Sequence, residues 1–345
     1  MLLHRLAEIR VLRAHAGRVG RTRPMVRHRK AVLVAAAVAV LGIGPAVGSA
    51  SHPGRNGSFA VLAGAKGGVL RGIVVSPGHG RARRWTITMP KNVFAVQISP
   101  DARRIAYNAG GNRPGVFVAD RDGRHPRRLA RYGADPVWSP DGRRLAFWQW
   151  RGPFPGTPGS YQRIYVADVA SGGVRSLAGT NGSKLAWSPD GRAIAFVSPG
   201  GLEWINAKGG KPHLVYHPTP SRVGIDSVDW SPDGSTFLLG LVDLEGQDFD
   251  APPAGPDTLG QIGLNTVGRN GRGIHRILGT TPFSGVPPAA WSPDGRSIAF
   301  ICGSPVSEPP ISICTTDGRG NQRRRLYSFR AGEEPSTLDW LARGV

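Results

Sequence analysis

One five-residue turn, repeated along the chain, constrains the fold more than any other feature of the sequence. Trp-Ser-Pro-Asp-Gly occurs verbatim at Trp138–Gly142, Trp187–Gly191, Trp230–Gly234 and Trp291–Gly295, and a degenerate copy, Ile98–Ala102, precedes them. Pro fixes φ, Asp can accept hydrogen bonds from the backbone that follows, and Gly tolerates a positive φ where the chain reverses. We therefore interpret the motif as a structural turn that carries no chemistry.

Each turn is followed by the same pattern of short strands. An apolar strand such as Ile194–Phe196 comes first, then a second strand such as Leu202–Asn206, and a glycine-bearing turn leads to a third. Together with the strand that ends at the Trp, every repeat has four antiparallel strands. Repeats of about 40 to 50 residues with this pattern are typical of β-propeller blades. The Trp supplies a large apolar plate that can pack between neighbouring blades.

The two ends of the sequence are expected to complete one blade. A truncated copy of the repeat stands at Leu338–Trp340, and the missing strands are predicted at Ser58–Ala63, Leu70–Val75 and Arg83–Thr88. Five complete repeats plus this shared one predict an all-β, six-bladed β-propeller of four-stranded antiparallel blades over residues 56–345. Closure by N- and C-terminal strands that share one blade removes exposed strand edges.

Residues 1–50 are predicted to be an N-terminal extension with a signal peptide. The apolar run Ala31–Val47 follows the basic residues Arg27–Lys30, and Gly48 and Ala50 suit cleavage after position 50. The run is short for a membrane-spanning helix, which needs about 20 apolar residues; an uncleaved N-terminal anchor is the alternative. We expect an extracytoplasmic protein, secreted or associated with the cell envelope, and held at the membrane only if the signal is not cleaved.

The first 24 residues have two interpretations. Met25 lies just before the export signal, so residues 1–24 could be a start-site misassignment. The alternative is a basic amphipathic helix, because Leu2, Leu6 and Ile9 recur at helical spacing.

The formal net charge of +21 does not by itself indicate a nucleic-acid site. Residues 1–50 hold nine basic side chains and one acid. Further arginines recur at matching turn positions, Arg103–Arg104, Arg143–Arg144, Arg192 and Arg296, and do not cluster with aromatic residues on one face. We expect these arginines to be solvated turn residues, with no specific nucleic-acid partner; nonspecific attraction to an acidic cell-surface polymer stays open.

The two cysteines lie on predicted adjacent strands, Cys302 on Ser297–Cys302 and Cys314 on Ile311–Thr315. Export would place them in an oxidising setting, where they could form a disulfide. Three intervening prolines leave the register of the two strands, and hence the bridge, undetermined. Two cysteines without nearby histidines do not make a ligand set, so no metal site is expected.

The turn followed by Ile-Ala-Phe, as in Trp291–Phe300, resembles the WD40-like repeats of the TolB propeller family. The resemblance covers roughly residues 56–345 and is specific for fold more than for function. TolB itself is periplasmic and works through protein–protein contacts in the Tol–Pal envelope system, which implies a binding or scaffold role. TolB also has a separate N-terminal α/β domain. Because only a few residues separate the predicted signal peptide from the first predicted strand, we expect no counterpart of that domain, and a full Tol–Pal role is not implied.

Linear motifs for catalysis are not found. The sequence has no Gly-x-Ser-x-Gly elbow, His-Glu-x-x-His helix, phosphate-binding loop or dinucleotide fingerprint. His125, His213, His217 and His275 are scattered near predicted strand ends or turns. We expect no cofactor and favour a non-enzymatic role, although a catalytic site shared by several blades around the channel would escape such a search.

An aromatic loop on the face opposite the repeated turns is the first binding candidate. It runs from Trp148 to Gln162 and carries Trp148, Trp150, Phe154 and Tyr161 among glycines and prolines. Exposed Trp and Tyr dominate binding hot spots, and long loops on a rigid scaffold commonly carry function. The alternative is that the aromatic residues fold back over the blade edge, which we favour for Trp148.

Two acidic features complete the candidates. The long connection at residues 240–260 carries Asp248 and Asp250, but it lacks the spacing of a calcium loop, so we interpret it as a solvated charge run. Asp229 and Asp339 precede the Trp on predicted innermost strands. They either line the channel mouth or accept hydrogen bonds from backbone donors.

The sequence therefore predicts a monomeric, exported TolB-like propeller that binds a protein or a cell-envelope polymer across its long-loop face. The alternative function is an extracytoplasmic hydrolase or lyase acting on peptides or polysaccharides at the channel.

Overall fold

The computed structural model describes the chain in ten stretches: residues 55–65, 69–76, 81–90, 92–151, 161–177, 180–219, 223–243, 263–279, 288–304 and 307–342. These stretches belong to one compact unit, Leu41–Val345. For residues 65, 69, 243, 304 and 307–310 only the backbone is described. The predicted signal peptide and the residues Phe154, Asp248 and Asp250 lie outside the described part of the chain.

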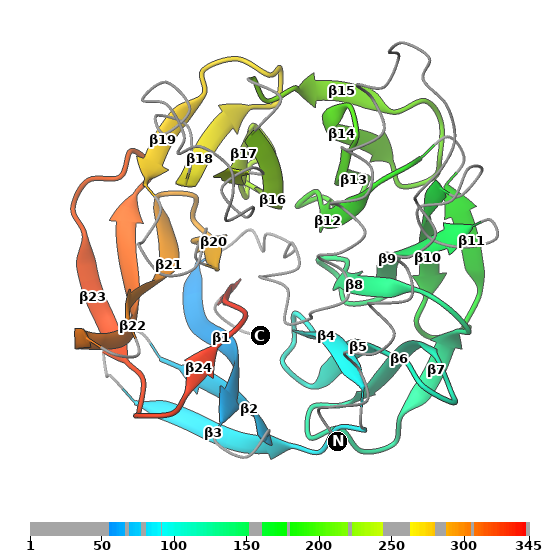
Figure 1. Cartoon of the computed structure of the whole chain (residues 1–345), viewed down its shortest axis with the longest axis horizontal. Helices are drawn as coiled ribbons and strands as arrows, with labels where there is room; N and C mark the ends of the chain where they lie inside the picture. Colours follow the sequence, from blue (N-terminus) through cyan, green and yellow to red (C-terminus); the bar gives the residue numbers. More distant parts are fainter. Residues whose placement is uncertain are drawn as a thin grey trace, which may run out of the picture. The chain divides into compact units, whose positions relative to one another are not determined.

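The described residues form 25 strands, arranged as six blades around a centre (Figure 1). Blades 1 to 5 each have four antiparallel strands, which follow the chain from the centre outward. Blade 1 has β4 (Val93–Ile98), β5 (Arg104–Ala109), β6 (Gly115–Asp120) and β7 (Arg127–Ala130). Blade 2 has β8 (Ala134–Trp138), β9 (Arg144–Arg151), β10 (Tyr161–Asp168) and β11 (Val174–Leu177). Blade 3 has β12 (Ser183–Trp187), β13 (Ala193–Ser198), β14 (Gly201–Asn206) and β15 (His213–Tyr216). Blade 4 has β16 (Val223–Trp230), β17 (Thr236–Asp243), β18 (Gly263–Gly268) and β19 (His275–Leu278). Blade 5 has β20 (Ala289–Trp291), β21 (Ser297–Ser304), β22 (Ser307–Asp317) and β23 (Arg324–Ser328).

Blade 6 joins the two ends of the chain. It has β25 (Asp339–Ala342), β24 (Glu334–Pro335), β1 (Asn56–Ala65), β2 (Val69–Val75) and β3 (Ala82–Ile87). The N-terminal β1 pairs with the C-terminal β25, so that Phe59 lies opposite Trp340 and Ala60 opposite Asp339. The predicted six-bladed propeller with a shared closing blade is therefore confirmed, with the short β24 as an addition to blade 6.

The repeated turn has the same hydrogen bonds in all five described copies. The Ser hydroxyl donates to the Asp carboxylate at 2.5–2.7 Å, in the pairs Ser99–Asp101, Ser139–Asp141, Ser188–Asp190, Ser231–Asp233 and Ser292–Asp294. The same carboxylate accepts the backbone N–H two residues further on. The last turn residue has a positive φ, which suits Gly142 at +65° but also occurs at Ala102, at +54°.

These contacts set the charge state of the turn carboxylates. Partial burial alone would raise the pKa of each turn Asp, but the Ser hydroxyl and the backbone N–H outweigh it and hold the pKa below its ordinary value. The turn is thus a closed hydrogen-bonded unit whose carboxylate stays ionised, in keeping with a structural role.

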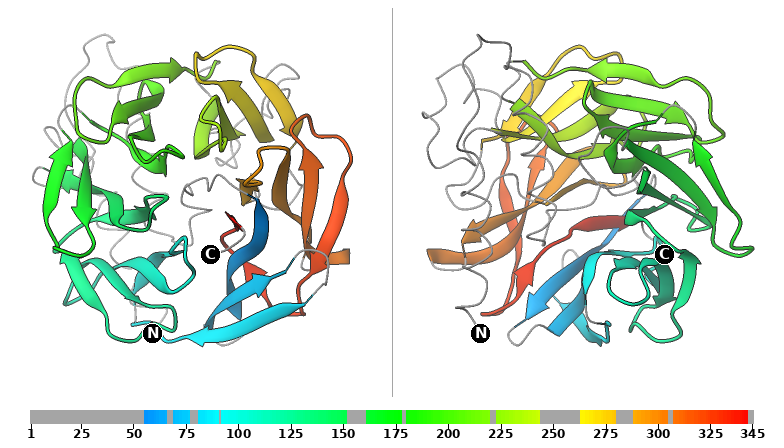
Figure 2. Two further views of the ribbon diagram at one scale, coloured as in Figure 1. Left: turned by 180° about the vertical axis from the view of Figure 1, so that it is seen from behind. Right: turned by 45° about the vertical axis from the view of Figure 1, so that its right-hand side comes forward.

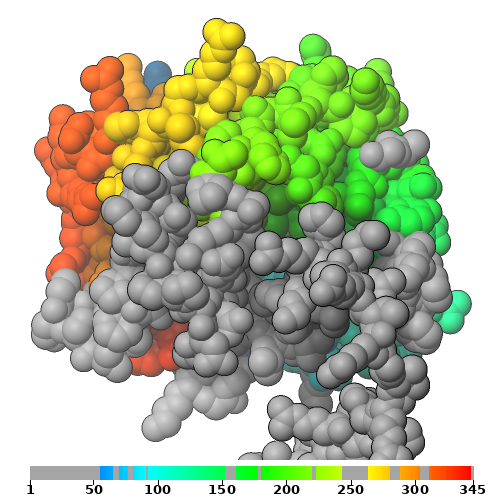
Figure 3. All heavy atoms as spheres, turned by 45° about the horizontal axis from the view of Figure 1, so that its top comes forward, coloured from blue at the N-terminus to red at the C-terminus, as the bar shows by residue number. Residues whose placement is uncertain are grey.

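The tryptophans link neighbouring blades. Trp138, Trp187 and Trp230 are fully buried, and each indole N–H donates to a carbonyl on the innermost strand of the preceding blade. The acceptors are Gln97 O at 3.4 Å, Val137 O at 3.1 Å and Ala186 O at 3.2 Å, respectively. Much of the core lies at these junctions, and Figure 3 shows blades 3, 4 and 5, from green through yellow to orange, side by side.

The turn arginines divide into two groups. Arg103, Arg143, Arg192 and Arg296 are exposed, in line with the prediction of solvated side chains. The prediction is wrong for Arg104 and Arg144, which begin the next strand and are half-buried. Arg104 lies over the Trp138 ring, with its guanidinium carbon 4.9 Å from the ring centroid, and donates to Gly142 O at 2.9 Å. These two arginines therefore stabilise junctions between blades.

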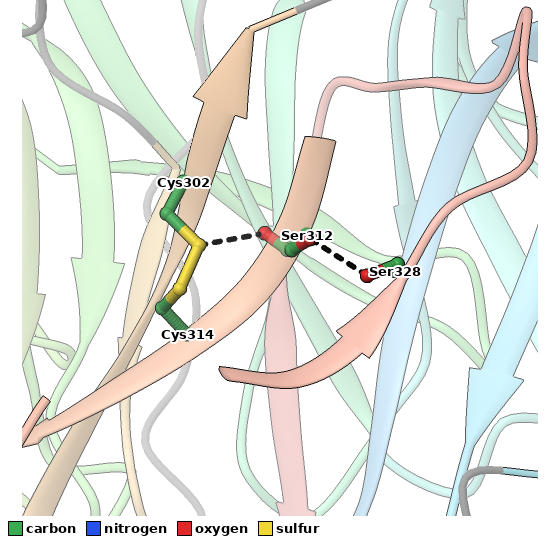
Figure 4. The surroundings of a disulfide bond; sticks show 4 residues. All are labelled: Cys302, Ser312, Cys314 and Ser328. Carbon is green, nitrogen blue, oxygen red and sulfur yellow. Dashed lines mark hydrogen bonds between the residues drawn. A yellow bond between two sulfur atoms is a disulfide. The ribbon is translucent and has the colours of Figure 1, made fainter. Parts of the chain in front are cut away.

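Cys302 and Cys314 are bonded as a disulfide between β21 and β22 (Figure 4). The register pairs Cys302 with Ser312 and Cys314 with Phe300, which leaves the two cysteine Cα atoms 5.9 Å apart. That spacing suits a bridge. The hydroxyls of Ser312 on β22 and Ser328 on β23 lie 3.0 Å apart. The disulfide thus joins β21 to β22, and this hydrogen bond joins β22 to β23 close by.

Candidate functional site

The strand order gives the propeller two distinct faces (Figure 2). The turn face carries the repeated turns and the connections between third and fourth strands. The loop face carries the connections between second and third strands and the crossovers between blades. The aromatic candidates therefore belong to the loop face.

Trp148 and Trp150 lie on β9 at the loop-face end of blade 2. Their rings meet edge to face, with centroids 5.9 Å apart. Trp148 is half-buried, and its indole N–H donates to the Asp135 carboxylate at 2.9 Å. This bond fixes Trp148 against its own blade, whereas Trp150 is half-buried nearer the end of the strand. Trp150 is accordingly the better placed of the two for contact with a partner.

Tyr161 stands across the hairpin on β10, opposite Arg151, and is 38% exposed. Arg163 lies over the Tyr161 ring, with its guanidinium carbon 5.2 Å from the centroid. Arg151 donates to the Tyr165 hydroxyl at 2.6 Å. The hairpin therefore presents aromatic rings and guanidinium groups side by side.

Two further aromatic residues, not singled out by the sequence, lie on the loop face of blades 1 and 2. Phe94, at the start of β4, is 57% exposed, and Tyr132, in the crossover from β7 to β8, is 48% exposed. Arg131 lies 5.6 Å from the centroid of the Tyr132 ring. We call Phe94, Tyr132, Trp150 and Tyr161 the aromatic rim. A lone aromatic residue in a short crossover has no motif, so only its place in the aligned repeat could have indicated it.

Asp229 and Asp339 are both 5% exposed and occupy the same repeat position on inner strands. The Asp229 carboxylate accepts the N–H of Trp230 at 2.8 Å and also that of Trp291 in the next blade. Burial raises the pKa of Asp229 well above its ordinary value, and the charge of Asp339 raises it further against the effect of these hydrogen bonds. Between the two alternatives predicted for this position, the geometry of Asp229 is that of an acceptor for backbone donors.

Gln97 occupies the same repeat position in blade 1 and was not singled out by the sequence. Its side-chain oxygen accepts the N–H of Trp138, in the next blade, at 2.7 Å. At Gln97 and at Asp229, this repeat position therefore links one blade to the next.

The remaining polar groups are dispersed. Within the described part of the chain, no group of three His, Cys, Asp or Glu side chains is placed to hold a metal ion. His125 lies 2.7 Å from Asp120, His217 contacts Gly200 O and His275 contacts Arg319 O. His213 stacks on Trp204. No helix formed by described residues is long and apolar enough to cross a membrane.

The chain resembles known proteins in its fold and not in its sequence. A search of protein-family models and a search of curated proteins find no match to the sequence. TolB from Acinetobacter baumannii superposes with a TM-score of 0.58 at 17% identity, over 83% of this chain and 67% of that one. The fold is that of a TolB-type propeller. The predicted resemblance is thereby confirmed at the level of architecture.

Two other solved structures extend the comparison. A chain from Agrobacterium tumefaciens assigned to TolB gives a TM-score of 0.53 at 17% identity, over 83% of this chain and 99% of that one. An oligogalacturonate lyase in complex with manganese gives 0.52 at 13% identity, over 80% and 76% of the two chains. Because a lyase and TolB share this architecture, the fold alone does not decide between binding and catalysis.

Proposed function

We propose that this chain is an exported, TolB-like propeller that binds a protein partner across its loop face, through the aromatic rim of blades 1 and 2. The observation that carries the proposal is the exposure of Phe94, Tyr132 and Tyr161. The other exposed large hydrophobic side chains of the described residues are aliphatic: Val174, Leu214, Ile274 and Leu326. Exposed rings are therefore concentrated on one face of two adjacent blades.

The composition around the rim favours a protein over a polysaccharide as partner. Guanidinium groups lie against two of the rings, Arg131 at Tyr132 and Arg163 at Tyr161. Tyr, Trp and Arg are the residue types most enriched in protein–protein hot spots. Rings and guanidinium groups together suit a protein surface with both apolar and acidic or carbonyl groups.

The scaffold supports this role. The rim lies on blades 1 and 2, whose junction is held by the Trp138 indole and the Arg104 guanidinium. It can therefore be presented with little loss of entropy on binding. The TolB-type fold and the predicted signal peptide favour an extracytoplasmic partner. Binding of a cell-envelope polymer, or turnover of a substrate, would correct the proposal.

The test is a quantitative capture experiment with the whole mature chain. Immobilised wild-type protein, a Tyr132→Ser/Tyr161→Ser variant and a Leu326→Ser control would be exposed to solubilised envelope proteins. Leu326 is exposed on the outer strand of blade 5, so the control changes an exposed apolar side chain away from the rim. We expect at least one envelope protein to be retained by wild type and control. The rim variant should retain about tenfold less of it, or still less.

Two results would contradict the proposal. One is equal retention by all three proteins, which would place binding elsewhere. The other is turnover of a peptide or polysaccharide by wild type and rim variant alike, without rim-dependent capture of any protein.

A further inference from the structure

A pocket of about 420 Å³ opens on the turn face where blades 2 and 3 meet. Arg144 of blade 2 lines one side, and Arg192 and Lys208, from two turns of blade 3, line the other. Asp190 is the one acidic side chain among its lining residues. Three cations therefore surround the pocket with a single carboxylate, far from the aromatic rim on the opposite face.

Arg144 is held in place before any ligand arrives. Its guanidinium carbon lies 4.7 Å from the centroid of the Trp187 ring, and its Nη2 donates to Gly191 O at 3.0 Å. Asp141 approaches the same nitrogen only to 3.9 Å, at the limit of an ion pair. A guanidinium fixed by a ring and a carbonyl loses little freedom on binding, and its remaining N–H groups can still donate.

A second arginine adds to the positive potential behind the pocket. Arg175, on β11, donates to Ala207 O, the carbonyl between Asn206 and Lys208. Partial burial lowers the pKa of Arg175, and the positive charge of Arg144 lowers it further. The two guanidinium groups are thus close enough to repel one another, and an anion would relieve that repulsion.

The equivalent junction of blades 1 and 2 provides an internal comparison. Arg104 and Arg143 match Arg144 and Arg192, and both junctions have the turn Asp. The matching third-to-fourth-strand turn, however, has Asp168 where blade 3 has Asn206, and Ala170 where it has Lys208. Arg127 donates to Val169 O as Arg175 does to Ala207 O, so that junction has three cations and two carboxylates, against four cations and one carboxylate between blades 2 and 3.

The junction of blades 3 and 4 has a different cation, Arg269, which lies over the Trp204 and Trp230 rings. Ala193 stands where blade 2 has Arg144, and Ser235 stands where blade 3 has Arg192. The excess positive charge between blades 2 and 3 is therefore not a property of the repeat. It results from side chains particular to this junction.

We propose that the pocket between blades 2 and 3 binds a phosphate group, either as the free ion or as part of a phosphate polymer. Guanidinium and ammonium donors converging on one space are the groups that bind phosphate oxygens in proteins. The Trp187 ring beneath Arg144 is fully buried, so it offers no surface on which a nucleic-acid base could stack. Recognition would rest on charge and hydrogen bonds to the phosphate itself.

Titration calorimetry on the whole mature chain tests the proposal, with inorganic phosphate in one arm and linear polyphosphate in the other. Arg192→Ala and Lys208→Ala each remove an exposed cation from the pocket. Arg143→Ala is the matched control, since Arg143 is the repeat equivalent of Arg192 at the less positively charged junction of blades 1 and 2. We expect each pocket variant to weaken binding about tenfold and the control to change it less than about twofold.

Binding in either arm with this pattern supports the site, and the arm with the tighter binding identifies the form of phosphate. The proposal is overturned if neither form binds at millimolar concentration, or if Arg143→Ala weakens binding as much as Arg192→Ala. Substitution of Tyr132 and Tyr161 should leave phosphate binding unchanged, so failure of this site and failure of the aromatic rim can be told apart.

Discussion

The indole N–H of Trp187 donates to the carbonyl oxygen of Val137 at 3.1 Å, across the junction of blades 2 and 3. Trp291 occupies the same position in blade 5, but its buried indole nitrogen has no hydrogen-bond partner within the described part of the chain. The two residues therefore differ in one interaction while sharing a place in the repeat.

This difference predicts unequal costs for the same substitution. Trp187→Phe and Trp291→Phe remove similar ring area, but only the first leaves a buried carbonyl without its donor. We expect Trp187→Phe to lower the free energy of unfolding by about 1 kcal/mol more than Trp291→Phe does. Urea denaturation of the two variants measures the difference, and equal losses would mean that the indole bond contributes nothing to stability.

The backbone conformation of Ala102 predicts that a glycine at this position stabilises the folded protein. It has a φ of +54° at the position where the verbatim copies of the turn have Gly. Because a Cβ is disfavoured in this region, Ala102→Gly should stabilise the protein by about 0.5 to 1 kcal/mol.

Gly142→Ala is the reciprocal control for Ala102→Gly. A Cβ on Gly142 would have its nearest neighbours at 3.6 and 3.7 Å, so only backbone strain is added. We expect a loss of about 1 kcal/mol. Changes of the same sign for both substitutions, measured by thermal unfolding, would contradict this account of the turn.

The buried carboxylate of Asp229 predicts stabilisation by its neutral analogue. Burial, and then the charge of Asp339, raise the pKa of Asp229 in the folded state. Such a group contributes full stability below its unfolded pKa, about 3.9, and loses that contribution as pH rises through the folded pKa. Asp229→Asn keeps an acceptor for the Trp230 N–H, so it should be more stable than wild type at pH 7. The advantage should vanish below about pH 4; a pH-independent difference in unfolding free energy would rule out the titration of Asp229 as its cause.

For Asp233 we expect the opposite pH dependence of the free energy of unfolding. Burial alone would raise its pKa, but the Ser231 hydroxyl and the Ser235 N–H hold it below the ordinary value. Its stabilising contribution is therefore present above the unfolded pKa and is lost as pH falls through the folded pKa. Asp233→Asn should destabilise the protein at pH 7, by no more than about 1 kcal/mol because the side chain is exposed, and the gap should narrow in acid. Unfolding curves recorded across this pH range would show whether the gap narrows.

The closing blade predicts a large effect of a short deletion. Trp340 is buried against Phe59, with ring centroids 4.6 Å apart, and Leu341 is buried in a different core cluster, with Ala60 and Leu62. Removing residues 335–345 should cost at least about 3 kcal/mol, since it uncovers core on both sides of the junction. A deletion of residues 343–345 alone leaves β25 in place and should melt close to wild type. Equal melting temperatures for the two deletions would show that β25 does not hold the ring closed.

The sequence allowed the architecture to be predicted because the repeat carries its own register. Each Trp-Ser-Pro-Asp-Gly copy marks the end of an inner strand, so counting copies also counts blades. The incomplete copy at Trp340 then indicated where the ring closes. These deductions rest on local turn chemistry, which a linear sequence displays directly.

The contacts between blades could not be predicted in the same way. Arg103 and Arg104 are neighbours in the sequence, yet only Arg104 reaches the Trp138 ring, which is 34 positions further on. Gln97 and Asp229 share a repeat position. Their side-chain oxygens link two blades only because a backbone N–H of the next blade faces each of them. The exposure of Phe94 and Tyr132 likewise depends on what packs nearby in space, which no local pattern records.

The pairing of β1 with β25 also has a consequence for the order of events during synthesis. The N–H of Leu62 donates to the Thr337 hydroxyl, a bond that joins residues 275 positions apart. Because a chain is made from its N-terminus, β1 must wait with an unpaired edge until nearly every other residue has emerged. Newly made chains at high local concentration could then exchange their last strands, each completing the other's ring. Correct closure would then compete with dimer formation, and the outcome would depend on how quickly the final strand arrives.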